Sequence, residues 1–322
     1  MKKFIFGIIT FAICIIMTQV NDVKAAVLTN VNGLELTDQN IEDLRSLGFT
    51  DEAIENMDEE EYQLNKDLKG EIVDTDTKYI KTITPEENSE MQPLEENEEL
   101  QRSLPEKSLN VLESNNSISI ELDEETFYKE LEQEKTGIKT MASDTTTTDY
   151  KIFKTTISKL SSSKYRLTNN MTWKKIPSTR QWDVSGVGIN STYWAPVPNS
   201  QYAKQNWKTY SHMSGNQSGS STYKSSSSYW SKKAGGYALK MNLPNNTTNG
   251  ADSKFVESLS NYMYYNVSKL ASTKQLDAYG AYRHQATSAS IGISYSISGS
   301  SLSVSPSTKF DGPITTHAQV KF

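Results

Sequence analysis

Hydrophobic and polar residues alternate along much of the second half of the chain. From Lys164 to Lys174, every second side chain is Tyr, Leu, Asn, Met or Trp, and the side chains between them are polar or charged. A period of two residues is typical of a half-buried β-strand. Related patterns predict further strands at 150–157, 182–190, 236–243, 276–284, 289–297, 302–304 and 313–322.

These strands follow one another with few helical stretches between them, which is the pattern of antiparallel folds. We therefore predict a mainly β protein whose C-terminal domain is an antiparallel β-sandwich, with a closed barrel as the alternative. A doubly wound α/β fold is excluded because it needs helices between its strands. Gly186 and Gly188 indicate that 182–190 is a central strand closely approached by another backbone.

A helical period replaces this alternation near the start of the chain. Between Leu36 and Tyr62, apolar residues recur three positions apart, and Thr37, Thr50 and Asp58 stand where they can cap three short helices. Gly48 fits the left-handed position that closes a helix. We predict a small α-helical hairpin module at 26–70, which is marginal alone and is either a passive module or a docking element.

The stretch 71–148 is rich in glutamate and proline and poor in aromatic residues. Such a composition buries too little apolar surface to offset the entropy of ordering. We predict an acidic, largely disordered linker at 71–148. A short helix is possible at 122–135, where Phe127 and Leu131 lie one helical turn apart.

The first residues have the layout of a secretory signal peptide. Lys2 and Lys3 precede the apolar run Phe4–Met17, which is too short to span a bilayer, and small residues stand at 25 and 26. We predict a signal peptide at 1–25 and a secreted, extracellular protein. Cys14 is the only cysteine, so the processed chain lacks disulfides, cysteine-based metal sites and a thiol nucleophile.

The formal net charge of −6 conceals two regions of opposite sign. Residues 27–148 contain 32 acidic and 10 basic residues, a net of −22, whereas 149–322 contain 6 acidic and 20 basic residues, a net of +14. All five tryptophans and 14 of the 17 tyrosines lie in the second region. We therefore predict a basic all-β domain at 149–322, with a possible intramolecular contact to the acidic N-terminal half.

Motifs of known chemistry are missing from the sequence. It has no Gly-x-Ser-x-Gly, no His-Glu-x-x-His and no phosphate loop, and only three histidines. We assign no catalytic residue, no metal and no cofactor, and we lean towards a non-enzymatic protein. A hydrolase with an unmarked site stays open, using His284 or His317 with Asp183, or the carboxylates of Asp183 and Asp277. A structural His284 and a pairing of Asp183 with Arg180 are the preferred interpretations.

Two stretches carry a resemblance to other proteins. They are Trp173–Gly186 (WKKIPSTRQWDVSG) and, about 100 residues on, Ala278–His284 (AYGAYRH). The chain over 159–298 is similar to a loose group of uncharacterised secreted proteins from Bacillus-type, Gram-positive bacteria. That resemblance implies export and a β-fold. The group has no known activity, so the resemblance implies no function.

The segment Asn199–Lys233 interleaves aromatic residues with serines and lysines. So little core pattern predicts either a functional loop or a long edge hairpin. Lysines attract polyanions, and exposed aromatic rings suit sugars or interfaces. The candidate ligand-binding residues are Tyr210, Tyr223, Tyr229, Trp230, Lys224, Lys232 and Lys233.

These residues lead to a functional hypothesis. We expect the basic β-domain to bind an anionic cell-wall polymer, a glycan or a lipid surface of the cell envelope, and no specific nucleic acid, since no recognition motif accompanies the charge. The first alternative is a precursor whose acidic pro-region masks a membrane-active, toxin-like β-domain until proteolysis near Lys135–Asp149. The second is the unmarked hydrolase.

Overall fold

The computed structural model describes residues 27–85, 108–114, 117–136, 146–288 and 291–322. The predicted signal peptide at 1–25 lies outside these residues, as do 86–107 and 137–145 of the predicted linker. The described chain is mainly β and its strands are antiparallel. Neither large sheet closes on itself, so the sandwich prediction is confirmed and the barrel alternative is wrong.

The larger sheet has nine strands in the described residues. Its order is β11 (Gly215–Tyr223), β10 (Tyr202–Ser211), β14 (Lys254–Lys269), β7 (Lys164–Lys175), β6 (Thr146–Lys159), β3 (Glu71–Pro85), β5 (Ser117–Leu122) and β4 (Ser108–Ser114), with β9 (Trp194–Pro196) paired to β14.

The smaller sheet has the order β12 (Trp230–Lys233), β13 (Gly236–Asn242), β8 (Trp182–Gly188), β15 (Gln275–His284) and β18 (Ile314–Lys321). Two short hairpins accompany the sheets, β1 (Val27–Thr29) with β2 (Glu35–Thr37), and β16 (Ser294–Ser298) with β17 (Ser301–Ser305). Only the last part of the strand expected at 289–297 therefore forms, and residues 289–290 are outside the described chain.

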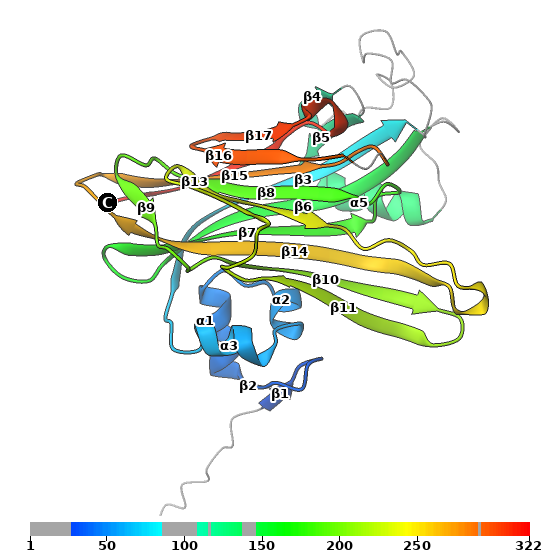
Figure 1. Ribbon diagram of the computed structural model, residues 1–322, viewed down its shortest axis with the longest axis horizontal. Coiled ribbons are helices and arrows are strands. Elements are labelled where there is room, and N and C mark those ends of the chain that lie inside the picture. The colour runs from blue at the N-terminus through cyan, green and yellow to red at the C-terminus, as the bar shows by residue number, and fades with distance from the viewer. Residues whose placement is uncertain (1–26, 86–107, 115–116, 137–145, 289–290) are drawn as a thin grey trace, which may run out of the picture.

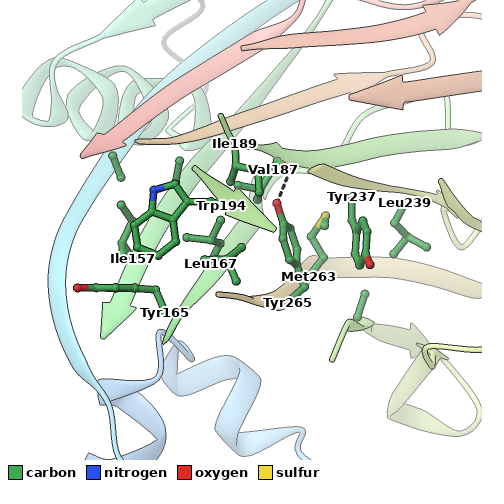
Figure 2. Packing of buried hydrophobic residues seen from close by; sticks show 14 of the residues in the cluster. Ile157, Tyr165, Leu167, Val187, Ile189, Trp194, Tyr237, Leu239, Met263 and Tyr265 are labelled. Atoms are coloured by element: carbon green, nitrogen blue, oxygen red, sulfur yellow. Dashed lines mark hydrogen bonds between the residues drawn. The ribbon is translucent and has the colours of Figure 1, made fainter. Parts of the chain in front are cut away.

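The main core lies between the two sheets (Figure 2). Leu167, Met263 and Tyr265 come from the larger sheet, and Val187 and Leu239 from the smaller one. The buried Tyr265 hydroxyl donates a hydrogen bond to the Val187 carbonyl over 2.7 Å, so it is not left without a partner. The inward residues of the alternating strands thus form the interior of a β-sandwich.

β8 is a central strand with a close backbone contact, as its glycines predict. A Cβ placed on Gly188 would lie 1.7 Å from the carbonyl oxygen of Gly299. No side chain larger than hydrogen fits there without moving backbone.

The three predicted helices form and cover the outer face of the larger sheet (Figure 1). They are α1 (Asp38–Ser46), α2 (Asp51–Glu55) and α3 (Glu59–Asn65), capped by the side chains of Thr37, Thr50 and Asp58. Gly48 has φ +94°, the left-handed value expected after α1. We call residues 27–70 the helical module. Its Phe49 packs edge-on against Tyr262 and Tyr264 of β14.

This cover changes the burial predicted for β7. The alternation of 164–174 indicated a half-buried strand, but Arg166, Thr168 and Asn170 on the polar face are also buried. Thr168 Oγ1 donates to the Leu47 carbonyl and Asn170 Nδ2 to the Gly48 carbonyl. The period-two pattern predicts which residues face the apolar core. It does not predict whether the polar face is covered by another part of the chain.

The prediction of a largely disordered linker at 71–148 is wrong for its described parts. These form β3, β4, β5 and α5 (Glu124–Lys135), the last at the place of the possible short helix. Strand β3 pairs with β6 from Glu71–Lys159 to Pro85–Thr146. Ion pairs such as Lys81–Glu130, at 2.8 Å, neutralise part of the charge that suggested disorder. The expected boundary at 148 falls inside β6.

The segment 199–233 is ordered as the predicted edge hairpin rather than as a long loop. Strands β10 and β11 pair from Ala203–Tyr223 to Ser211–Gly215. Of these two strands, only β10 is paired with the rest of the sheet, through β14. Strand β11 is therefore an edge of the larger sheet, and the connection from β11 to β12 joins the two sheets.

Candidate functional site

Five of the seven predicted ligand-binding residues lie together around the connection from β11 to β12. They are Tyr223, Lys224, Tyr229, Trp230 and Lys232. The Trp230 indole Nε1 donates to the carbonyls of Tyr223, over 3.3 Å, and Lys224, over 3.0 Å. The rings of Tyr223 and Tyr229 have centroids 5.7 Å apart. Trp230 thus stabilises the connection on which Lys224 and Tyr229 lie.

Tyr223 and Trp230 belong to the main core and do not present their rings to a ligand. Their relative exposures are 6% and 7%. Burial raises the pKa of Tyr223 to about 12, so its hydroxyl stays neutral. Their serine- and lysine-rich surroundings suggested exposure, but they lie at the end of β11 and the start of β12, where the strands enter the core.

The exposed members of the predicted set are Lys224, Tyr229, Lys232 and Lys233. The structure adds Lys240 of β13, whose Nζ lies 5.6 Å from the ring centroid of Tyr229 and 4.9 Å from that of Trp182. We call these four lysines with Tyr229 the lysine patch. The sequence held a signal for Lys240, since it alternates with the buried Leu239 and Met241 and therefore points outward.

Tyr210 does not join this patch. It lies on β10 near the far end of the β10–β11 hairpin, opposite Asn216 and Phe255. Its hydroxyl lies 3.3 Å from Nδ1 of His212.

Lys232 also has a local contact, since its Nζ donates to the Ser225 carbonyl over 2.7 Å.

A cleft of about 260 Å³ adjoins the patch at Lys224. It runs between α3 and the outer face of the larger sheet. Amides, tyrosines and cations dominate its sheet side, in the residues Arg166, Asn199, Gln201, Tyr202, Lys224, Tyr264 and Asn266. The buried Gln201 donates to the Ser225 carbonyl, whereas its Oε1 has no hydrogen-bond partner among the described residues. The sheet side of the cleft is therefore polar and suits an ionic or hydroxyl-bearing ligand, whereas Leu64 and Leu68 line the side of the module.

Carboxylates of the helical module face the cations of the basic region. The buried Lys204 Nζ lies 2.8 Å from Asp58 Oδ2, and the exposed Lys224 Nζ lies 2.7 Å from Glu60 Oε2. Burial acts to raise the pKa of Asp58, but hydrogen bonds from Lys204 and the Glu61 backbone outweigh it and hold the pKa below its usual range. The module's contact with the sheet is thus charged as well as apolar.

The hydrolase alternative centres on His284, whose Nδ1 donates to Asp183 Oδ1 over 2.7 Å. Asp183 therefore does not pair with Arg180 as expected, and it also accepts from the Tyr282 hydroxyl. His284 and Asp183 are 4% and 0% exposed. Burial raises the pKa of Asp183. The cavity beside His284 holds about 10 Å³, which is room for one water and not for a substrate.

The second pair of expected carboxylates does not come together. Asp183 is level with His284 on β15, whereas Asp277 lies seven residues away on that strand, about 23 Å at the rise of a β-strand. A glycosidase pair needs roughly 5–10 Å. Asp277 instead accepts a bond from Nε2 of the half-exposed His317, over 2.9 Å.

Comparisons with known proteins add no functional assignment. No family model and no curated protein matches the chain. Among solved structures, the C-terminal domain of the Streptococcus agalactiae AgI/II polypeptide BspA is 8% identical with a TM-score of 0.28, covering 76% of this chain and 85% of that one. Clostridium perfringens delta-toxin is 9% identical with a TM-score of 0.23, covering 54% and 84%. At such scores these likenesses carry no argument about function.

Among the described residues, no helix is both long and apolar enough to cross a bilayer. Nor do three or more histidine, cysteine, aspartate or glutamate side chains of these ranges group so as to hold a metal ion. The lysine patch and its adjoining cleft form the candidate site.

Proposed function

We propose that this protein is a secreted, non-enzymatic binding protein whose lysine patch holds an anionic polymer of the cell envelope. The observation that carries the proposal is that Lys224, Lys232 and the exposed Tyr229 lie at the connection between the sheets, with Lys240 beside Tyr229 and Lys233 at the end of β12. Lysine is a flexible point charge that suits repeated phosphates without demanding one geometry. A +14 region also attracts polyanions over distance.

An extended ligand fits this surface better than a small one. Three cations of the patch are exposed and Lys240 is half-buried, and an isolated exposed ion pair contributes only about 0–1 kcal/mol. Useful affinity then requires several contacts along one chain, which a polymer supplies. Tyr229, 39% exposed, adds a ring with a polar tip among these lysines.

The working molecule in this proposal includes residues 71–148. Strand β3 lies between β6 and β5, and its ladder with β6 spans 71–85 and 146–159. Proteolysis near Lys135–Asp149 would leave β3 held by that ladder. We therefore do not favour release of 149–322 as a separate toxin-like domain.

The test is the binding of purified poly(glycerol phosphate) teichoic acid by the full chain, followed by calorimetry at rising salt. The triple variant K224A/K232A/K233A should lose most of the affinity, and wild-type binding should weaken steadily with salt because phosphate contacts are screened. The matched control K159A/K164A/K321A removes three exposed lysines from other strands. It should bind nearly as the wild type does.

Two results would overturn the proposal. Equal losses in both triple variants would mean that net charge alone attracts the polymer and that the patch is no site. Binding that is insensitive to salt would instead indicate stacking of sugars on tyrosines, and a glycan would replace the polyanion as the ligand.

A further inference from the structure

The face of the larger sheet beneath the helical module has the composition of a binding surface. Tyr202, Lys204, Tyr262, Tyr264 and Arg166 all point outward from β10, β14 and β7 and meet the module. Three tyrosine rings and two cations on one sheet face are unusual contents for a contact that serves only to bury apolar area. Rings and cations of this kind recur where proteins hold polar ligands.

The contacts show which chemistry this face accepts. Besides Asp58, which bonds Lys204, the module brings Glu61 to the Tyr262 hydroxyl at 2.6 Å and Glu52 to the Ser260 hydroxyl at 2.8 Å. Arg166 donates to Asn65 over 2.7 Å. Carboxyl and amide oxygens of the module therefore occupy the positions where oxygens of an anionic ligand would be bound.

One polar group on this face is left without a partner. Asn206 lies two residues beyond Lys204 on the same face of β10 and is 2% exposed, yet neither its Oδ1 nor its Nδ2 has a hydrogen-bond partner among the described residues. A buried amide without partners is costly, so this face is incompletely satisfied by the module. A hydroxyl- or phosphate-bearing ligand would supply what Asn206 lacks.

The seam between module and sheet is also open. The 260 Å³ cleft opens at the edge of the contact between α3 and the sheet and is lined by Lys224, whose Nζ is bonded to Glu60 of the module. Lys224 is thus shared between the lysine patch and the module. The covalent link is short, because α3 ends at Asn65 and β3 starts at Glu71. Displacement of the module would leave every strand of the larger sheet in place.

From these observations we propose that the helical module is a competitive cover over a second anion-binding surface, formed by Arg166, Lys204, Tyr202, Tyr262 and Tyr264 and continuous with the lysine patch through Lys224. This inference rests on the proposed binding of an anionic polymer. The polymer displaces the carboxylates of the module, and the uncovered face then extends the binding surface along β10, β14 and β7.

The first experiment is amide hydrogen exchange on the intact wild-type protein, with and without poly(glycerol phosphate) teichoic acid. Competition predicts faster exchange in α1, α2 and α3 when the polymer is bound, with unchanged exchange in β14, because binding and displacement are reciprocal. Unchanged or slower exchange in the helices while the polymer is bound would overturn the inference and leave the lysine patch intact as a site.

The second experiment uses the variant D58N/E60Q, which removes the carboxylate partners of Lys204 and Lys224 but retains the shape, the Asp58 cap oxygen and the bond from Lys204 to the Asn56 carbonyl. The uncompensated Lys204 should open the module, and teichoic acid affinity should rise at least about tenfold, within the usual range of coupling between sites. The control E125Q/E132Q removes two exposed charges from α5 and should show no such gain.

The outcomes separate this inference from the proposed function. Faster exchange in the helices of D58N/E60Q without a gain in affinity would refute the covered surface alone. Helices that stay protected in D58N/E60Q would also refute it, since these carboxylates would then not hold the module. Binding by D58N/E60Q but not by the wild type would support the covered surface and refute the exposed patch, and failure of both to bind would refute both.

Discussion

The hydroxyl of Tyr262 donates to both carboxyl oxygens of Glu61, over 2.6 and 2.7 Å, and both side chains are buried between the helical module and the larger sheet. Burial raises the pKa of Glu61 to about 8, against the opposing effect of the Tyr262 hydrogen bond. Glu61 is therefore protonated in the docked module at neutral pH. The contact between module and sheet depends on a proton.

Glu61 makes stability depend on pH. Its folded-state pKa is above its unfolded value, so its contribution is fully present below about pH 4.5 and is lost as pH rises through about 8. The replacement E61Q keeps an acceptor for Tyr262 and has no proton to lose. We expect E61Q to gain on the order of 2–4 kcal/mol over wild type at pH 9 and little at pH 4.5.

Urea unfolding at both pH values measures this difference. The exposed Glu59 on the same helix provides the control E59Q, which should follow the wild type at each pH. A constant offset between E61Q and wild type across this range would contradict the raised pKa.

Replacement of His284 should test the interior network. H284A removes one hydrogen-bond donor from the buried Asp183, which keeps only the Tyr282 hydroxyl, and a buried acceptor left unsatisfied costs about 1–3 kcal/mol. We expect a loss of this size in thermal or urea unfolding. The exposed His212 offers the control H212A, which should change stability by less than about 0.5 kcal/mol. A stable H284A protein that has lost a hydrolytic activity would show that His284 is catalytic.

Trp230 should affect binding without touching the ligand. W230F removes the indole donor to the carbonyls of Tyr223 and Lys224, and the Lys224 carbonyl keeps the bond from the Ser227 N–H, so we expect a cost of about 1 kcal/mol. We expect lower stability and weaker teichoic acid binding, because the connection that carries Lys224 loosens. W207F, at a partly buried ring of β10, is the matched control. Full affinity in W230F would exclude this positioning role.

The close approach at Gly188 predicts a sharp contrast between two glycines. G188A would place its Cβ within 1.7 Å of the Gly299 carbonyl oxygen, so backbone must move and we expect a loss of about 2 kcal/mol or more. Gly292 has no atom within 4 Å of such a Cβ, and G292A should be nearly neutral. Similar melting temperatures for the two variants would refute the close contact.

The parts of the fold that sequence predicted are those governed by local rules. The alternation of 164–174, the caps at Thr37 and Thr50 and the glycine at 48 depend on neighbours within a few residues, and the structure contains each feature. The strand Glu71–Pro85 has the same local alternation in part, but its charge and proline suggested disorder. Its order comes from pairing with β6, which no local pattern reports.

In the candidate site too, the features that depend on local sequence were predicted and those that depend on distant contacts were not. Lys224, Lys232 and Tyr229 could be selected because lysines and rings among serines stay exposed, and they are exposed. Tyr223 and Trp230 have the same neighbours in sequence but end and begin strands that enter the core. The carboxylate partners of Lys204 and Lys224 lie more than 140 residues away, so their pairing was beyond sequence reasoning.

The position of β3 bears on how the chain reaches this structure. Its partners in β6 lie more than 60 residues downstream, with β4, β5 and α5 encoded between them. The pairing of β3 with β6 therefore cannot be completed until residue 159 has left the ribosome. Such distant pairing gives a high contact order and slow folding. A nascent chain cut short before β6 would present β3 as an unpaired edge, exposed to pairing with other chains.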